Sequence, residues 1–163
     1  MRFLISSSFS SVSAAAVIET GMATQPTGIS AEFTWQKSEG IICRYRDDQN
    51  FVIFVVFVRL FTVDASGPKL YTAITGRGFS HGTQLTLNLG DYVLTDRPPI
   101  AAGSKHTLLV KCTATDFAVS LDGAAPHHFE SSDQANFPNF LDFTKHGIFS
   151  SHRLATFTNF TVS

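Results

Sequence analysis

The sequence predicts an all-β domain built as a two-sheet antiparallel β-sandwich, and three observations favour this class. Apolar and polar residues alternate with a period of two in several segments, which is the pattern of strands with one buried face. These segments are separated by turn residues, such as the Asp122-Gly123 pair. The chain also holds 16 phenylalanines among 163 residues, and phenylalanine favours buried sheet faces.

Strand signals run along most of the chain. Residues 29–36 alternate strictly, with apolar side chains at the odd positions, so we expect Trp35 to be a core residue. Residues 51–58 are apolar at every position, which predicts a central strand covered on both faces. We expect further strands over residues 40–46, 69–75, 83–89, 106–112, 116–122 and 154–162.

The segment 40–46 combines apolar and basic residues. Alternation places Ile41, Cys43 and Tyr45 on one face of this strand. Arg44 and Arg46 are then expected on the opposite face, either in solvent or presenting planar donors to a sugar or a carboxylate.

Three segments are expected to interrupt the strands. Residues 47–50 have the composition of a turn between two strands. Gly76-Arg77-Gly78 is expected to break the chain. Residues 91–104 contain Pro98-Pro99 and Gly103, so we expect a loop with at most a short edge strand there.

The start of the chain loosely resembles a signal peptide, with Ala14–Ala16 as the small residues of a cleavage site, but the match is incomplete, and no segment predicts a membrane span. The apolar residues near Met1 are interrupted by serines, whereas a signal sequence has an unbroken run of roughly 7 to 15 apolar residues. We therefore expect the first strands of the domain there. The longest apolar run, residues 51–63, contains Arg59 and is shorter than the ~20 residues of a transmembrane helix. With no repeat or linker, residues 1–163 are expected to form one domain.

The charge of the chain argues against nucleic-acid partners. It has 12 basic and 13 acidic residues, and its formal net charge is -1 at pH 7. A nearly neutral chain with no long basic cluster lacks the electrostatic attraction that phosphate backbones require. The charged fraction of 15% is also below the roughly 25% of ordinary soluble domains.

The two cysteines, Cys43 and Cys112, lie far apart in strand-like segments. A disulfide would form if the two strands were neighbours, but two cysteines give no framework pattern. We expect them to be two small buried hydrophobic side chains, and their spacing predicts no zinc site.

Several motifs, in order, resemble those of laminin-G-like and concanavalin-A-like jelly-roll domains. The hairpin Gly40–Phe51 is similar to the family's G-x-x-x-R-Y-x-D-x-x-N-aromatic pattern. The remaining matches are His106–Val110, Phe117–Gly123, Gly147–Phe149 and Ala155–Val162. The resemblance covers residues 28–163 and implies a jelly-roll sandwich, a fold that hosts lectins, adhesion modules, glycosidases, lyases and capsid parts. Thr158 replaces the family's closing aspartate, which weakens any calcium site that would use that carboxylate.

The acidic residues do not predict an enzyme. Glycosidases of this fold carry paired acids on one strand, because one carboxyl protonates the leaving oxygen while the other attacks or activates water. The glutamates Glu19, Glu32, Glu39 and Glu130 are instead scattered. No G-x-S-x-G motif is present, although composition alone leaves a Ser-His-Asp arrangement open.

Polar residues near strand ends and turns are the candidate ligand contacts, because binding residues concentrate there. Those in the 47–50 turn also have the oxygen chemistry of calcium ligands, but they are expected to be turn formers, and we predict no metal or cofactor. The candidates are Arg44, Arg46, Asp47, Asp48, Asn50, Tyr71, His81 and Tyr92.

One motif concerns modification. Asn159-Phe160-Thr161 fits the N-glycosylation sequon, which has meaning only in a secreted eukaryotic protein. Burial of Asn159 in the last strand is the alternative.

The leading functional interpretation is a non-catalytic binding module, lectin-like and directed at carbohydrate. A self-assembling surface or coat subunit and a glycan-active hydrolase or lyase are the alternatives. We expect a glycan or protein ligand, and a homo-oligomer is compatible with the composition. The resemblance, rather than any targeting residue, favours an extracellular or surface location.

Overall fold

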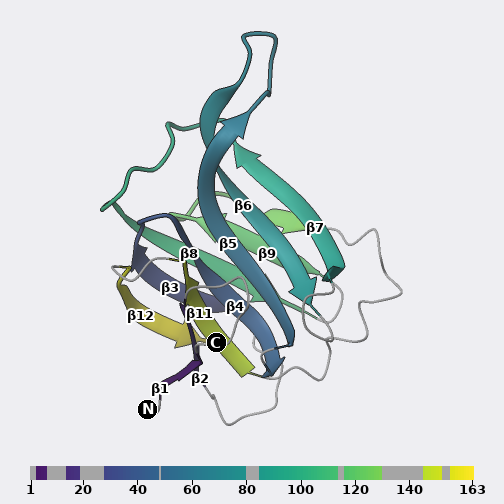
Figure 1. The fold of residues 1–163 in the computed structure, drawn as a ribbon, viewed down its shortest axis with the longest axis vertical. Coiled ribbons are helices and arrows are strands. Elements are labelled where there is room, and N and C mark those ends of the chain that lie inside the picture. Colours follow the sequence, from purple (N-terminus) through teal and green to yellow (C-terminus); the bar gives the residue numbers. More distant parts are fainter. Residues whose placement is uncertain are drawn as a thin grey trace.

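The computed structural model describes residues 3–6, 14–18, 28–47, 49–79, 85–113, 116–129, 145–151 and 155–163, with backbone alone for 3–6, 14–18 and 85–87. Within these residues the chain forms two antiparallel sheets packed face to face (Figure 1). The sandwich predicted from the sequence is confirmed.

The larger sheet has seven strands, and β5 lies near its centre, as the apolar run of residues 51–58 predicts. Their spatial order is β1 (Phe3–Ser6), β2 (Ala14–Ile18), β11 (Lys145–Ser150), β4 (Ser38–Asp47), β5 (Asn50–Phe61), β6 (Lys69–Phe79) and β7 (Leu85–Leu94). The smaller sheet has five strands, in the order β10 (His127–Phe129), β9 (Phe117–Leu121), β8 (Lys105–Cys112), β3 (Ile29–Thr34) and β12 (Phe157–Val162).

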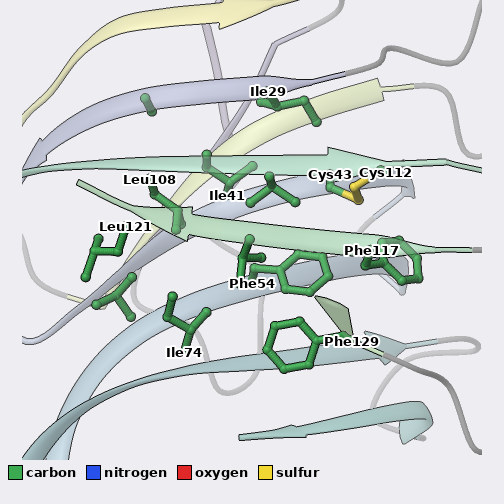
Figure 2. Packing of buried hydrophobic residues seen from close by; sticks show 14 of the residues in the cluster. Ile29, Ile41, Cys43, Phe54, Ile74, Leu108, Cys112, Phe117, Leu121 and Phe129 are labelled. Atoms are coloured by element: carbon green, nitrogen blue, oxygen red, sulfur yellow. A yellow bond between two sulfur atoms is a disulfide. The ribbon is translucent and has the colours of Figure 1, made fainter. Parts of the chain in front are cut away.

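The main core lies between the two sheets. Phe54 of β5 is fully buried, and its ring centroid lies 5.4 Å from that of Phe117 and 5.5 Å from that of Phe129 (Figure 2). Offset and tilted aromatic pairs at such distances add to the free energy of burial. Trp35 is also buried here, in agreement with its expected core position.

A β-bulge in β4 changes which side chains face the core. Ile42 pairs with Ile53 and Arg44 pairs with Val52, so Cys43 is an extra residue on its strand. Two successive side chains, Cys43 and Arg44, therefore both point toward the smaller sheet. The prediction that strict alternation separates them is wrong, because alternation fails at a bulge.

The two cysteines are joined. Cys43 of β4 and Cys112 of β8 form a disulfide, with 6.5 Å between their Cα atoms, and link the two sheets (Figure 2). The expectation of two unbridged buried cysteines is therefore wrong, and the alternative is correct. The bond closes a long segment, with a sequence separation of 69 residues, so the chain-entropy model assigns it about 4 kcal/mol of stability.

One predicted interruption is instead strand. Gly76–Gly78 lies within β6, where a Cβ on Gly76 would come within 2.8 Å of the Phe54 ring, so this glycine makes room for the core. Residues 91–94 are the end of β7, an edge strand that pairs with Thr72 to Thr75 of β6, and residues 95–104 lie outside any strand, so the predicted loop with a short edge strand is confirmed. The hairpin of β8 and β9 and the strands expected near the N-terminus are confirmed.

Candidate ligand-binding face

The outer face of the seven-stranded sheet, turned away from the core, carries a polar cluster that spans three strands. Phe54 and Val56 point inward from β5, so Val55, Phe57 and Arg59 point outward. The same alternation places Thr75 and Arg77 of β6, and Asp91 of β7, on this outer face. Three neighbouring strands thus contribute side chains to one surface.

Arg59, Arg77 and Asp91 form what we call the arginine–aspartate cluster. Arg59 Nη2 lies 3.0 Å from Asp91 Oδ2, and Arg77 Nη2 lies 3.1 Å from Asp91 Oδ1. Each carboxylate oxygen therefore accepts from a different guanidinium. The Arg59 side chain is 60% exposed, whereas that of Asp91 is 19% exposed. Two cations surround one anion, so the cluster carries one net positive charge.

The cluster has a fixed half and an exposed half. Arg77 Nη1 also donates to the carbonyl oxygens of Gly76, at 2.9 Å, and Gly90, at 3.1 Å, so its side chain is held in place. Arg59 instead lies over two aromatic rings, 4.7 Å from the centroid of Phe61 and 5.4 Å from that of Phe57. A planar, exposed cation stacked on aromatic rings retains donors that a ligand can meet.

The other end of this face is apolar. Ile42, Phe51, Ile53 and Phe149, from β4, β5 and β11, form a second buried cluster with no charged member. The rings of Phe51 and Phe79 stack with 4.8 Å between centroids. Polar recognition on this face is therefore concentrated over β5, β6 and β7.

The structure separates the candidate residues that the sequence predicted. Arg44 is 3% exposed, and its guanidinium donates to the Thr113 carbonyl beside the Phe117 ring. Burial lowers the pKa of Arg44 below its usual value. The expected solvent-facing position of Arg44 is wrong, because the bulge turns it inward, and this placement does not support direct ligand contact.

The turn residues form a local network. Asp47 Oδ1 accepts from the Gln49 backbone N–H at 2.9 Å and from Asn50 Nδ2 at 2.7 Å, which is the geometry of a turn former. Arg46 is exposed at the end of β4. Asp48 and His81 lie outside the described residues.

The two candidate tyrosines lie in different places. Tyr71 is paired with Arg59 in the β5–β6 register and is half-buried on the outer face, next to the arginine–aspartate cluster. Tyr92 packs against the core and stacks on His127, with 3.8 Å between ring centroids and 1° between planes. Burial, followed by the nearby His128, lowers the pKa of His127. Among the predicted candidates that the structure describes, Tyr71 is therefore the one beside the cluster.

The cluster itself was missed by the sequence reasoning. Arg59 was noted only as an interruption of an apolar run, while Arg77 and Asp91 were assigned to a break and a loop. The sequence does contain a signal for the cluster. The outward-pointing residues of β5 and β6 are both odd-numbered, so pairing of these strands places Arg59 and Arg77 on the same face. Recognising it requires that β6 continue through its glycines.

A second polar network lies at the start of β8. Ser104 Oγ lies 2.6 Å from His106 Nε2, and His106 Nδ1 lies 2.8 Å from Asp122 Oδ2, which is the connectivity of a hydrolase triad. However, the serine hydroxyl donates to the Ala101 carbonyl at 2.5 Å, so its proton is not directed at the imidazole. Thr107 N–H donates to the remaining Asp122 oxygen at 2.9 Å. The network therefore ties the loop before β8 to the turn after β9.

Metal-ligand clusters and membrane-spanning helices are absent from the part of the chain that the structure describes. There, no three His, Cys, Asp or Glu side chains converge on a possible metal position. The described residues likewise include no helix with the length and hydropathy needed to cross a bilayer.

Comparisons with known proteins place the fold. No protein-family model matches the chain, and no curated protein sequence matches it. Three solved structures cover 91%, 91% and 93% of this chain, with TM-scores of 0.60, 0.58 and 0.58. They are a carbohydrate-binding module, CBM66, from Bacillus subtilis (16% identity, 81% of that chain), a tetrameric galectin from the ball sponge Cinachyrella sp. (13%, 98%), and a toad ovary galectin in complex with thio-digalactose (10%, 100%).

One of these structures is named a carbohydrate-binding module and another was solved with thio-digalactose, and the architecture shared by all three is the two-sheet jelly roll. At identities of 10 to 16%, the likeness concerns the fold. The same fold is indicated by three observations: the order of the motifs along residues 28–163, the two antiparallel sheets and these structural matches. The chain has the two-sheet jelly-roll fold of these proteins.

Proposed function

We propose that this protein is a non-catalytic glycan-binding module whose ligand lies on the outer face of β5, β6 and β7. The observation that carries the proposal is the arginine–aspartate cluster, in which Arg59 and Arg77 share Asp91. Tyr71 and Phe57 stand beside it as aromatic neighbours of Arg59. The guanidinium donors of the two arginines, the carboxylate acceptor of Asp91 and the aromatic rings therefore lie close together on one face.

The chemistry of this area suits a sugar. Neighbouring hydroxyl groups of a pyranose or furanose both donate and accept, so one hydroxyl pair can meet the Asp91 carboxylate and an arginine together. Arg77 is held by Gly76 and Gly90, so its share of the site is pre-organised and little ordering is needed on binding. The apolar face of a sugar ring can pack on an aromatic side chain next to this polar pair.

The fold comparison supports the class of ligand. CBM66 is a carbohydrate-binding module, and the toad galectin was solved with thio-digalactose. Glycan binding by the present chain remains the proposal, because fold alone does not fix a ligand.

A glycan-array screen with an Asp91→Asn variant tests the proposal. The variant removes the charge that both arginines share, so we expect at least a tenfold loss of binding with an unchanged circular dichroism spectrum. Asp96→Asn is the matched control, because Asp96 also pairs with an arginine, Arg97, but lies in the loop after β7. If the wild type binds no sugar on the array, the proposed glycan-binding function is wrong. Wild-type binding that survives Asp91→Asn would overturn the site.

One observation favours a second candidate, a self-associating subunit. The hairpin of β5 and β6 extends past its neighbours, since β4 pairs only to Phe57 and β7 only from Thr72 (Figure 1). Its exposed apolar side chains are Leu60 (61%), Leu70 (54%) and Val63 (48%). Such residues gather at protein interfaces. Light scattering of the wild type and of a Leu60→Ser/Leu70→Ser variant tests this candidate, which requires a wild-type oligomer that the double variant dissociates.

A further inference from the structure

We propose that Asn159 is an N-glycosylation site, and that its glycan stands on the outer face of the five-stranded sheet. The segment Asn159-Phe160-Thr161 supplies the required acceptor amide and, two residues later, the required hydroxyl. The motif alone is common and proves nothing about use. The placement of these residues in the fold carries the inference.

Asn159 is on the surface and at a break in the sheet. It lies in β12, an edge strand, and the register with β3 is interrupted between Thr158 and Thr161. Asn159 has a φ of 51°, a left-handed conformation that asparagine tolerates better than most residues. Its side chain is exposed, so the alternative that it is buried in the last strand is wrong. A bulky substituent there displaces no core residue.

The local hydrogen bonds are compatible with the modification. Asn159 Nδ2 donates to Glu32 Oε2 at 2.8 Å, and the Thr158 hydroxyl donates to the same oxygen at 3.2 Å. In the transfer, Nδ2 forms a bond to the anomeric carbon of a lipid-linked oligosaccharide pyrophosphate, whose carbon–oxygen bond to phosphate breaks. One amide proton is released with the lipid pyrophosphate. The second amide N–H remains available as a donor to Glu32.

The disulfide supplies an independent observation on compartment. Cys43 and Cys112 are bonded across the two sheets, and structural disulfides persist in oxidising compartments such as the secretory pathway. In eukaryotic cells this is also the compartment in which sequons are modified. Motif, exposure and redox chemistry therefore point to the same cellular route.

The position of the glycan also has a structural consequence. Glu32, which Asn159 contacts, points outward from the five-stranded sheet, whereas the arginine–aspartate cluster points outward from the seven-stranded sheet. The glycan would stand on the opposite side of the sandwich from the cluster. It would cover the exposed edge of β12, and a covered edge strand is protected against pairing with other chains.

The test expresses the full chain behind a cleavable secretion leader in cultured human cells. The intact mass is measured before and after peptide N-glycosidase treatment on the combined cellular and secreted pools, so that a poorly folding variant is still scored. We expect the wild type to lose the mass of a glycan, with Asn159 converted to aspartate. Thr161→Ser, which keeps the hydroxyl, should be modified, and Thr161→Ala should not.

Thr158→Ala is the matched control, because Thr158 also contacts Glu32 but is not part of the sequon. It should be modified as the wild type is. Wild-type chain that carries an unmodified Asn159 in both pools would overturn the proposal. Equal modification of Thr161→Ala would overturn it as well, because the sugar would then be elsewhere.

Discussion

Arg59 and Arg77 bind the same carboxylate, but their environments give them different tasks. Arg77 is fixed by two backbone carbonyls in addition to Asp91, whereas Arg59 is 60% exposed and lies on aromatic rings. An ion pair this exposed contributes at most about 1 kcal/mol to stability. Arg59 is therefore more valuable to a ligand than to the fold.

Substitution of Arg59 by lysine tests the importance of the planar group. Arg59→Lys keeps the charge but loses the flat, forked donor and its stacking on Phe61. We expect roughly a tenfold loss of glycan affinity, about 1.4 kcal/mol, and an unchanged melting temperature. Titration calorimetry with an array-selected glycan measures the affinity. An Arg59→Lys variant that binds as the wild type does would show that only charge matters.

His146 makes stability depend on pH. Burial lowers the pKa of His146 from 6.5, and the charge of Arg44 adds to this, while a hydrogen bond to the Cys43 carbonyl opposes it. Below pH 6.5 the unfolded chain therefore binds a proton that the folded chain does not. The free energy of unfolding should fall as pH drops from 6.5 toward the lowered folded pKa, by up to about 1.4 kcal/mol per pH unit from this group.

Urea unfolding at pH 7.5 and 5.5 checks this dependence. His146→Asn retains an amide donor near the Cys43 carbonyl but cannot titrate, so its loss of stability on acidification should be smaller than that of the wild type. A remainder is expected from His127, whose pKa burial also lowers. His128→Asn, at an exposed position, is the control. Equal acid sensitivity of wild type and His146→Asn would contradict the assignment.

At the scale of strands, the central position of β5 was predictable because residues 51–58 are apolar at every position, as in a strand covered on both faces. The bulge in β4 was not, since one inserted residue leaves no local mark in an alternating sequence. The strand β6 was predicted to break at Gly76–Gly78, and this prediction failed for a related reason. Glycine marks chain breaks in isolation, but Gly76 is required by the Phe54 side chain of the neighbouring strand, which is a tertiary cause.

Gly76→Ala tests that cause. The added methyl group would lie 2.8 Å from Phe54 Cε1 and 2.9 Å from Leu89 Cδ1, so these core side chains must shift. We expect a loss of about 1 to 3 kcal/mol in the free energy of unfolding, as for other overpacked cores. Gly28→Ala is the control, because its nearest contact is the Ser163 hydroxyl at 3.3 Å, at the chain end. A Gly76→Ala variant as stable as the wild type would show that the core side chains do not require a glycine at this position.

At the scale of the whole molecule, two sheets enclose one core and one disulfide joins them. The sandwich and its family resemblance were predictable from strand periodicity and from motifs in order. The candidate site was not, because Arg59, Arg77 and Asp91 come from three strands and meet only through sheet register. The disulfide was not predicted for the same reason, since β4 and β8 belong to different sheets and approach each other only in the folded sandwich.

Removal of the disulfide should weaken the whole domain. A Cys43→Ala/Cys112→Ala variant loses the link between sheets, and we expect a loss of 2 to 5 kcal/mol, the usual range for a native disulfide in a small domain. Denaturant unfolding of both proteins measures the difference. Free thiols in the non-reduced wild type, detected by alkylation and mass spectrometry, would contradict the bond itself.

The central claim is that a glycan binds over β5, β6 and β7, and NMR titration of the labelled protein with an array-selected glycan tests it most directly. We expect shift changes at Arg59, Arg77 and Asp91, with none at Glu32 and its neighbours on the opposite sheet. Shift changes confined to the five-stranded sheet, or to the turn at residues 47–50, would contradict it.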